Sequence, residues 1–311
     1  MSRRTLPLGI DVGAVRTRVA LLELDPQGRP ALVAVAARAC AAADAAAAIG
    51  DARDELRTRE RRCVLALTVP DAVVRTVVFP SMSARERTRA ARFEAARFVP
   101  YPAAESDVRV IPAGRAHCVV AVARRAALDA RIGTARRAGL RPLAVDDAAF
   151  ALMRAFPDAG AIVDVGEDAT TLTVPGDTVP SVAIVAPGSG ALSRAVAEAL
   201  GIDRATADER KHAIGLAGAG DGAREALIDA LASSLASHRA ASASEIRSVV
   251  LTGNGARLAG FAVALERAIA IPVSVGAIAT VAAPAYPPDV VRAASPDWAL
   301  AYGLALWERA A

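Results

Sequence analysis

The sequence is poor in the residues that build disulfide frameworks and metal centres. It has only three cysteines, Cys40, Cys63 and Cys118, and they are far apart, with no Cys-x-x-Cys pair. Neither a disulfide framework nor a zinc site is therefore expected. The three histidines do not cluster either, so catalysis that depends on histidine is not expected.

Aromatic residues and lysine are scarce as well. Aromatic residues make up 4% of the chain, so the core must consist mainly of alanine, valine, leucine and isoleucine. Lys211 is the only lysine, and the other basic residues are arginines. The net charge is only +4 over 311 residues, and the basic residues do not interleave with aromatic ones. We therefore expect no nucleic-acid partner.

No long hydrophobic run is present. The most apolar window, residues 31–50, is interrupted by Arg38 and Asp44 and falls short of the ~20 continuous apolar residues of a membrane span. The first eleven residues contain two arginines but no hydrophobic stretch, so no signal peptide is expected. The expected location is the bacterial cytoplasm, and docking on a membrane partner stays open.

The chain does contain a regular alternation of apolar runs and turn residues. Strands are predicted at residues 6–12, 17–24, 63–69, 73–79, 108–111, 117–122, 143–145, 161–165, 170–174, 179–186, 248–252 and 273–275. Helices are predicted at 36–59, from Ser83 to just before Pro100, at 126–139 and 148–156, from Gly190 to Leu200, and from Pro296 onward, with a loop at 215–222. Strands that alternate with helices indicate an α/β fold.

One short pattern occurs twice. Residues 9–13 read Gly-Ile-Asp-Val-Gly, and residues 162–166 read Ile-Val-Asp-Val-Gly. In each, an apolar strand delivers an aspartate, Asp11 or Asp164, to a glycine turn, and a second strand follows. Two halves with matching hairpins indicate a duplicated fold with a cleft between two lobes.

The two Asp-x-Gly hairpins suit a phosphate site. Glycine has no β-carbon, so the backbone near Gly13 and Gly166 can approach a phosphate closely. The aspartates Asp11 and Asp164 can position Mg²⁺, usually through its water ligands. A third glycine turn, residues 188–190, lies at a helix start, where N–H groups favour anions.

A fourth glycine turn, residues 253–255, follows a predicted buried strand, and a turn with so few side chains can lie flat against an adenosine. Taken alone, an Asp-x-Gly hairpin or a Gly-Asn-Gly turn is usually an ordinary connection. The order of two hairpins followed by two glycine turns is much rarer, and it predicts a nucleotide cleft between the lobes.

These motifs resemble the phosphate 1, phosphate 2, connecting and adenosine motifs of the actin-like ATPases, which include Hsp70 chaperones, sugar kinases and the cell-division protein FtsA. Residues 207–215 resemble the Glu-x-Lys helix that touches the nucleoside there, and a merely solvated Lys211 is an equal alternative. The resemblance implies a duplicated, ribonuclease-H-like actin/Hsp70-type ATPase fold with ATP and Mg²⁺ between two lobes.

Within this superfamily, the chain resembles the family of the type IV pilus assembly protein PilM from near Leu8 to near Trp307. The specific part is the block 69–144, which separates this family from sugar kinases and chaperones and contains VPDAVVRTVVFPSMSARERTRAARFEAARFVPYPAAESDVRV. The opening GIDVGAVRTRVALLEL, the internal AGLRPLAVDDAAFALMRAF and the ending ALAYGLALWERA are similar too.

The resemblance implies lobe 1 at residues 1–158, with an inserted α/β subdomain at about 70–140, and lobe 2 at 159–311, with its terminal helix packed back on lobe 1. It also implies a cytoplasmic scaffold of type IV pilus assembly at the inner face of the inner membrane. In that family the inserted subdomain helps to form a groove for the N-terminal peptide of the inner-membrane protein PilN. Other inner-membrane platform proteins of the pilus are further expected partners.

The resemblance also implies site residues. Phosphates are expected at Gly13, Thr17, Arg18, Gly166, Thr170, Thr171, Gly188 and Gly190, adenosine at Glu209, Lys211, Gly253, Asn254 and Gly255, and Mg²⁺ at Asp11 and Asp164, through water.

The chain departs from the family pattern at the same site. Ala14, Val15 and Arg16 replace a run of serines, Arg18 replaces a lysine and Asn254 replaces a glycine. No residue is identified as a base that would activate water, so ATP binding is expected ahead of hydrolysis. Two alternatives stay open: a pseudo-ATPase adaptor with an empty cleft, as in a related type II secretion system, and, less favoured, a sugar kinase.

A run of arginines crowds the helix that begins with the capping box of Ser83 and Glu86. The arginines are Arg85, Arg87, Arg89, Arg92 and Arg97. A solvated helix face, with Glu86 and Glu94 as partners, is the usual outcome of such a run. The alternative is a docking face for an acidic partner or for anionic lipid head groups.

Overall fold

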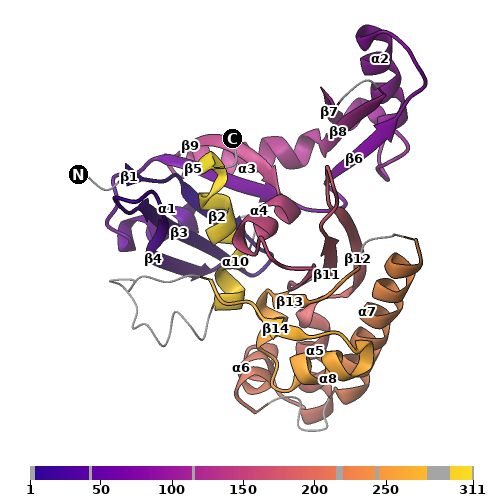
Figure 1. Cartoon of the computed structure of the whole chain (residues 1–311). Helices are drawn as coiled ribbons and strands as arrows, with labels where there is room; N and C mark the ends of the chain where they lie inside the picture. The colour runs from indigo at the N-terminus through magenta and orange to yellow at the C-terminus, as the bar shows by residue number, and fades with distance from the viewer. Residues whose placement is uncertain are drawn as a thin grey trace.

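A computed structural model describes residues 4–41, 44–113, 116–214, 220–241, 245–278 and 295–309. The chain forms two α/β lobes and a small three-stranded unit that projects away from them (Figure 1). The two lobes repeat one plan, which confirms the predicted duplicated α/β fold.

Lobe 1 is built on a six-stranded sheet. Its strands are β1 (Arg4–Thr5), β2 (Leu8–Val12), β3 (Arg16–Leu24), β4 (Pro30–Ala39), β5 (Arg62–Leu67) and β9 (Arg141–Asp147). β2, β3 and β4 are antiparallel, and β5 and β9 continue the sheet as parallel strands beyond β2. Because side chains alternate along a strand, one face packs on α1 (Ala45–Glu55) and α3 (Arg125–Arg137), and the other packs on α4 (Ala148–Ala155) and α10 (Ser295–Ala305).

Lobe 2 repeats this plan with five strands in the order β12 (Ser181–Pro187), β11 (Ala169–Val174), β10 (Ala161–Val165), β13 (Val249–Thr252) and β14 (Val273–Val275). The first two pairings are antiparallel and the last two are parallel. The lobe contains the helices α5 (Ser189–Leu200), α6 (Arg204–Ile214), α7 (Asp221–Ala241) and α8 (Phe261–Ile269) and the short 3₁₀ helix η3 (Asn254–Arg257). The register repeats as well, since Asp11 lies opposite Arg18 in lobe 1 and Asp164 lies opposite Thr171 in lobe 2.

The projecting unit is an antiparallel sheet in the order β6 (Ala72–Val78), β8 (His117–Arg124) and β7 (Ser106–Pro112), with α2 (Ala84–Ala95) on one face. Ala91 and Ala95 of α2 pack on Cys118 and Val120 of β8. The capping box at Ser83 is present as predicted, with Ser83 Oγ accepting from the Glu86 amide at 3.3 Å. Although α3 lies within the expected 70–140 insertion, it packs chiefly on β5 and β9 of lobe 1.

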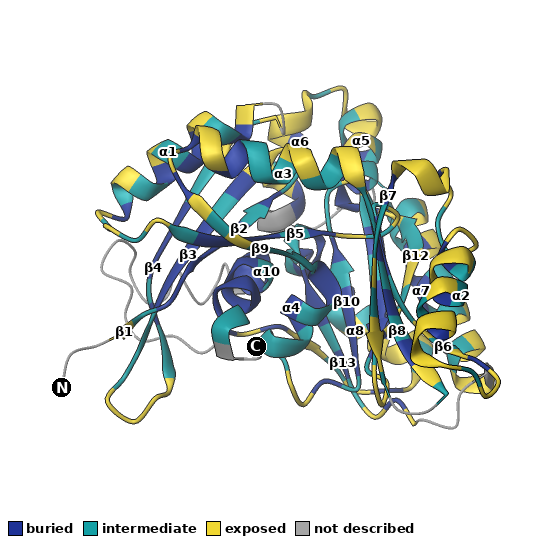
Figure 2. Cartoon of the chain, turned by 90° about the horizontal axis from the view of Figure 1, so that it is seen from above, coloured by how far each residue is buried: buried dark blue, intermediate teal, exposed yellow. Residues whose placement is uncertain are grey.

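The helix α10 lies between the two lobes and is almost wholly buried (Figure 2). Its residues Ala299 and Tyr302 share one core with Leu22 of lobe 1 and Ile162 of lobe 2. Two glycines make this packing possible: a β-carbon on Gly9 would overlap the Ala301 carbonyl, and one on Gly303 would overlap the Ala151 carbonyl. Close backbone contact therefore fixes the helix against β2 and α4.

The predicted helix at 36–59 is wrong over its first part. The structure has the strand β4 through Ala39, paired with β3 along its length, and the helix α1 covers only Ala45–Glu55. Alanine has a high helix propensity, but this preference is small, and pairing with β3 while burying Leu32 and Val35 outweighs it. The helix predicted to continue to Pro100 ends at Ala95. Most of the predicted loop 215–222 lies outside the described residues.

Candidate functional site

The two Asp-x-Gly hairpins face each other across one cavity of about 430 Å³ between the lobes. Asp11 and Gly13 line it from lobe 1, and Asp164 and Gly166 line it from lobe 2. Each aspartate is the second-last residue of its strand, so the sheet fixes where its carboxylate lies. The cavity is therefore the place where the two halves of the duplicated fold meet.

Asp11 lies in a strongly charged part of this cavity. Arg18, its partner across the hairpin, places Nη1 3.4 Å from Asp11 Oδ2. Burial raises the pKa of Asp11, and the charges of Arg18 and Arg131 oppose that shift. Arg131 comes from α3 and lines the cavity too. No motif marked Arg131 in the sequence, because its place depends on how α3 packs on lobe 1.

Asp164 has a different environment. Thr252, at the end of the neighbouring strand β13, donates a hydrogen bond from Oγ1 to Asp164 Oδ1 at 3.0 Å. Burial raises the pKa of Asp164 to about 6; the hydrogen bond from Thr252 opposes this shift and the charge of Asp11 adds to it. A cation between the two carboxylates would relieve their mutual repulsion.

A third carboxylate, Asp297 of α10, lies close to an arginine of each lobe. Its Oδ2 lies 3.1 Å from Arg257 Nη1 of lobe 2 and 4.0 Å from Arg18 Nη2 of lobe 1. The Asp297 side chain is only 4% exposed, and its Oδ1 has no hydrogen-bond partner among the described residues. Sequence reasoning missed Asp297, although an acidic residue in the first turn of the terminal helix was visible.

The structure brings eight of the fifteen predicted site residues to the cavity wall. These are Asp11, Gly13, Arg18, Asp164, Gly166, Thr171, Gly253 and Asn254. The remaining seven are Thr17, Thr170, Gly188, Gly190, Glu209, Lys211 and Gly255, and the structure does not place them on it.

Two of the predicted hydroxyl groups face away from the cavity. Thr17 is fully buried, with Oγ1 3.3 Å from Cys40 Sγ, and Thr170 donates to the Pro187 carbonyl at 2.8 Å. The described lining instead takes its hydroxyls from Thr171, which was predicted, and Thr68, which was not.

The glycine turn before α5 is packed on the second hairpin. The amides of Gly188, Ser189 and Gly190 donate to the carbonyls of Asp168, Gly166 and Glu167 at 2.7 to 3.0 Å. A β-carbon on Gly188 or Gly190 would overlap Glu167. These glycines therefore allow close packing of α5 against the hairpin, and their N–H groups bind backbone oxygens in this arrangement.

Of the five expected adenosine contacts, Gly253 and Asn254 line the cavity, and Glu209, Lys211 and Gly255 do not. Lys211 is fully buried, with Nζ donating to Asp208 Oδ1 at 2.7 Å and to Ser193 Oγ at 2.8 Å. The solvated alternative for Lys211 is therefore wrong. Asp208 lines the cavity in its place, Glu209 is exposed, and Gly255 packs closely on Val165.

The carboxylates suit a metal held mostly by water. Among the residues that the structure describes, no group of three or more His, Cys, Asp or Glu side chains is placed to hold a metal ion directly. The charge of Asp11 nevertheless raises the pKa of Asp164 across the cavity. Mg²⁺ commonly keeps several waters and binds through one or two carboxylates together with phosphate oxygens, so this pair fits a water-bridged Mg²⁺.

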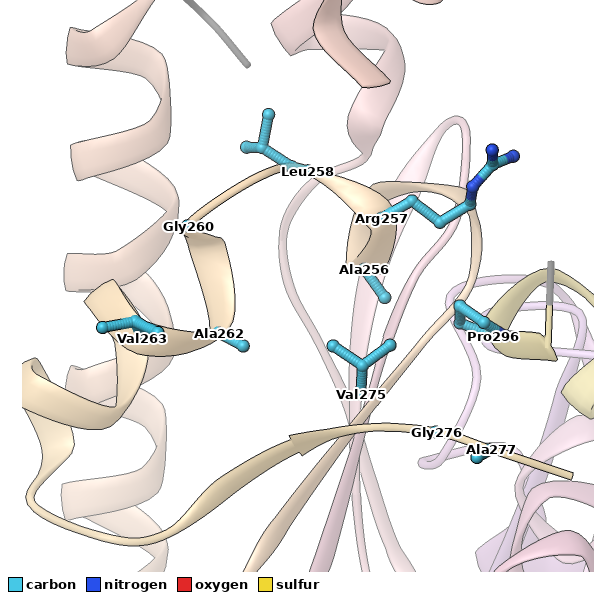
Figure 3. Close-up of a pocket in the computed structure, with 10 residues that line it drawn as sticks. All are labelled: Ala256, Arg257, Leu258, Gly260, Ala262, Val263, Val275, Gly276, Ala277 and Pro296. Atoms are coloured by element: carbon cyan, nitrogen blue, oxygen red, sulfur yellow. The ribbon is translucent and has the colours of Figure 1, made fainter. Parts of the chain in front are cut away.

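A second cavity of about 430 Å³ lies in lobe 2, and mostly apolar residues line it. Ala256 and Val275 face each other across it, while the Arg257 side chain extends away (Figure 3). It contains no predicted site residue and no carboxylate, so the polar chemistry belongs to the cavity between the lobes.

Comparison with known proteins identifies the family. The family model of the type IV pilus assembly protein PilM matches residues 33–309. The chain belongs to the PilM family. Its fold resembles the solved PilM-PilN type IV pilus biogenesis complex, with a TM-score of 0.83, 25% identity and coverage of 97% of this chain and 98% of the other. No curated protein matches the chain.

More distant structures share the fold of this PilM-family chain. The ethanolamine utilization protein EutJ from Carboxydothermus hydrogenoformans has a TM-score of 0.63 and 16% identity over 98% of this chain and 90% of its own. A glycerol dehydratase reactivase has a TM-score of 0.56 and 12% identity over 98% and 100%. The MamK double helical filament has a TM-score of 0.51 and 12% identity over 98% and 99%. These likenesses support the actin-like, two-lobed fold.

The departures from the family pattern lie on the cavity wall. Ala14 and Val15 line it where serines are expected, and Arg18 lines it where a lysine is expected. The first hairpin therefore offers a guanidinium and backbone groups in place of a row of hydroxyls.

Within the described residues, no helix is both long and apolar enough to cross a membrane.

Proposed function

We propose that this PilM-family protein is an actin-like scaffold of type IV pilus assembly that binds a magnesium–nucleotide complex between its lobes. The observation that carries the proposal is the placement of Asp11 and Asp164 on opposite walls of one cavity. The eight predicted residues on the cavity wall and the cofactors ATP and Mg²⁺ are part of the proposal. It concerns binding and does not extend to hydrolysis.

The charges of the cavity favour a metal complex over the free nucleotide. Its described lining has six carboxylates, Asp11, Asp164, Glu167, Asp168, Asp208 and Asp297, and three guanidinium groups, Arg16, Arg18 and Arg131. Arg204 pairs with Glu167, Lys211 with Asp208 and Arg257 with Asp297. The carboxylates left are Asp11, Asp164 and Asp168, which the three guanidinium groups of the lining balance in number. The carboxylates of Asp11 and Asp164 still repel a bare polyphosphate locally, and a divalent cation between them removes that repulsion.

We further propose that the protein binds the N-terminal cytoplasmic peptide of a PilN-type inner-membrane protein. The likeness to the PilM-PilN complex over nearly the full length of both chains supports this partner. The projecting unit of β6, β7, β8 and α2 lies beside lobe 1, where the family places its peptide groove. Through this partner and other platform proteins, the protein would act at the inner face of the inner membrane.

Calorimetric titration with Mg-ATP tests the nucleotide site. Asp11→Ala and Asp164→Ala are expected to weaken binding about tenfold or more, the range found when supports of a metal site are removed. Asp51→Ala, on the exposed side of α1, is the control and should bind as the unaltered protein does. Equal affinity in all three variants would exclude this site.

A synthetic N-terminal peptide of a PilN-type protein tests the partner. Fluorescence anisotropy of the labelled peptide should rise on addition of the protein, with and without Mg-ATP. Absence of binding under both conditions would contradict the scaffold role, whatever the result of the nucleotide titration.

A pseudo-ATPase adaptor is the second candidate. Two observations favour it. Ala14 and Val15 lie on the cavity wall, and Arg18, a predicted phosphate contact, is already paired with Asp11. Peptide binding without any Mg-ATP binding would support this candidate over the first.

A further inference from the structure

The structure assigns a second role to the projecting unit: we propose that the outer face of α2 docks on an anionic membrane surface. The docking face consists of Arg85, Arg89, Arg92 and Phe93. The proposal rests on the proposed function in one respect only, because a partner in the inner membrane would bring this face close to lipid head groups.

The docking face follows from the spacing of residues along the helix. Arg87, Ala91 and Ala95 are the buried residues of α2, and they form the side that packs on the small sheet. Positions 85, 89 and 92 follow at intervals of four and three residues, so they share the opposite side. All three arginines are exposed, and the Phe93 ring beside them is 79% exposed.

The three guanidinium groups have no carboxylate partner among the described residues. The two acidic residues of the helix are already engaged: Glu86 accepts from Ser83 in the capping box at 2.7 to 2.9 Å, and Glu94 pairs with Arg97 at 3.1 Å. A cluster of unpaired positive charge in solvent is complementary to an anionic surface.

The shape of this face fits a bilayer better than an acidic peptide. It is the convex side of a single helix, and no α2 residue lines the cavity between the lobes or the apolar cavity of lobe 2. Arginine clusters also recognise acidic peptide motifs, but the outer side of a lone helix has no sheet edge along which a peptide backbone can pair. A bilayer needs only access to this face. Access is present, because α2 lies at the end of the projecting unit, away from both lobes (Figure 1).

An exposed phenylalanine beside arginines also suits a lipid interface. Arginine can keep its guanidinium at the phosphate level while its alkyl stem lies on apolar surface, and an aromatic ring inserts at the head-group boundary. Each basic residue changes membrane partitioning only about fivefold. Three of them give weak binding that depends on salt, so the face works as a second contact beside a protein tether.

Vesicle sedimentation with the full chain, without nucleotide or peptide, tests the proposal. Binding is expected to vesicles of phosphatidylethanolamine and phosphatidylglycerol, to be absent with phosphatidylcholine alone, and to be lost in high salt. The triple variant Arg85→Gln, Arg89→Gln, Arg92→Gln should lower the partition coefficient up to about 100-fold. The matched control Arg59→Gln, Arg136→Gln, Arg141→Gln removes three exposed arginines from lobe 1 and should stay within about twofold.

Two further measurements complete the test. Phe93→Trp should show fluorescence quenching by brominated anionic lipid, and circular dichroism should show that both triple variants remain folded. Equal loss of binding in the two triple variants would overturn the proposal, because net charge alone would then explain it. Absence of binding to the anionic vesicles would also overturn it, in particular if the protein binds soluble polyglutamate instead. Because neither nucleotide nor peptide is present, failure here leaves the nucleotide and peptide tests unaffected.

Discussion

Asp11 and Arg18 are direct partners across the first hairpin, with Arg18 Nη1 3.4 Å from Asp11 Oδ2. Arg18 also approaches Asp297, which Arg257 of lobe 2 binds. One arginine thus connects the first hairpin with the helix that lies between the lobes. A nucleotide entering the cavity must share this guanidinium with two carboxylates.

Replacement of Arg18 should therefore weaken nucleotide binding. Arg18→Met removes a charged donor from the phosphate side and leaves Asp11 and Asp297 with less compensation, so Mg-ATP binding should weaken by about 1.5–3 kcal/mol. Arg18→Lys restores the charge but cannot face Asp11 and Asp297 with two separate nitrogens, so it should recover only part of the loss. Calorimetry measures the affinity. Tighter binding in Arg18→Met would show that the ion pair competes with the nucleotide.

The raised pKa of Asp164 predicts that the stability of the protein depends on pH. Its pKa is about 6 in the folded protein, above the ordinary value of 3.8, so the folded state takes up a proton that the unfolded state releases. The contribution of Asp164 to the free energy of unfolding therefore falls as pH rises from about 4 to 6, by about 1–3 kcal/mol. Urea unfolding of the free protein at several pH values measures it. Asp164→Asn, which can still accept from Thr252, should make the curve flatter over this range.

The same ionisation should act on ligand binding with the opposite sign. A cation requires the charged carboxylate, so the affinity for Mg-ATP should rise as pH increases from about 5 to 7. Because ATP itself titrates in this range, the informative quantity is the difference between the unaltered protein and Asp164→Asn. If the two proteins show the same pH dependence, Asp164 has no part in cation binding.

Lys211 is expected to stabilise lobe 2 more than it binds nucleotide. Its ammonium group holds Asp208 of α6 and Ser193 of α5 in a buried network, and burial lowers its pKa. Lys211→Met keeps the stem but removes the ion pair, at a cost of about 1–3 kcal/mol. Thermal melting and calorimetry on the same variant separate the two roles. A loss of affinity above tenfold with unchanged stability would restore the predicted nucleoside contact.

Two glycine substitutions should change stability in opposite directions. A β-carbon on Gly303 would overlap the Ala151 carbonyl, so Gly303→Ala must displace α10 from α4 and should cost about 3 kcal/mol or more. Gly50 lies inside α1, and no atom lies within 4 Å of the position that a β-carbon would take there. Gly50→Ala should therefore stabilise by about 0.5–1 kcal/mol. Urea unfolding measures both, and destabilisation by Gly50→Ala would contradict this account of the packing.

The sequence by itself determined the duplicated plan of the fold. The repeated strand, aspartate and glycine turn predicted both hairpins, and the structure places Asp11 and Asp164 on one cavity. Such local patterns are readable because a buried strand, a turn and a capping box each depend on neighbouring residues. The family resemblance is confirmed by the match over residues 33–309.

Only the tertiary structure decided which polar groups meet at the cavity. Arg131 and Asp297 reach it from helices that are distant from the hairpins in sequence. Lys211 is buried, and its ammonium group pairs with Asp208. The strand β4 likewise depends on pairing with β3 and not on its alanine content. Contacts between distant segments depend on how helices and sheets pack, and a local pattern of residue types contains no information about that packing.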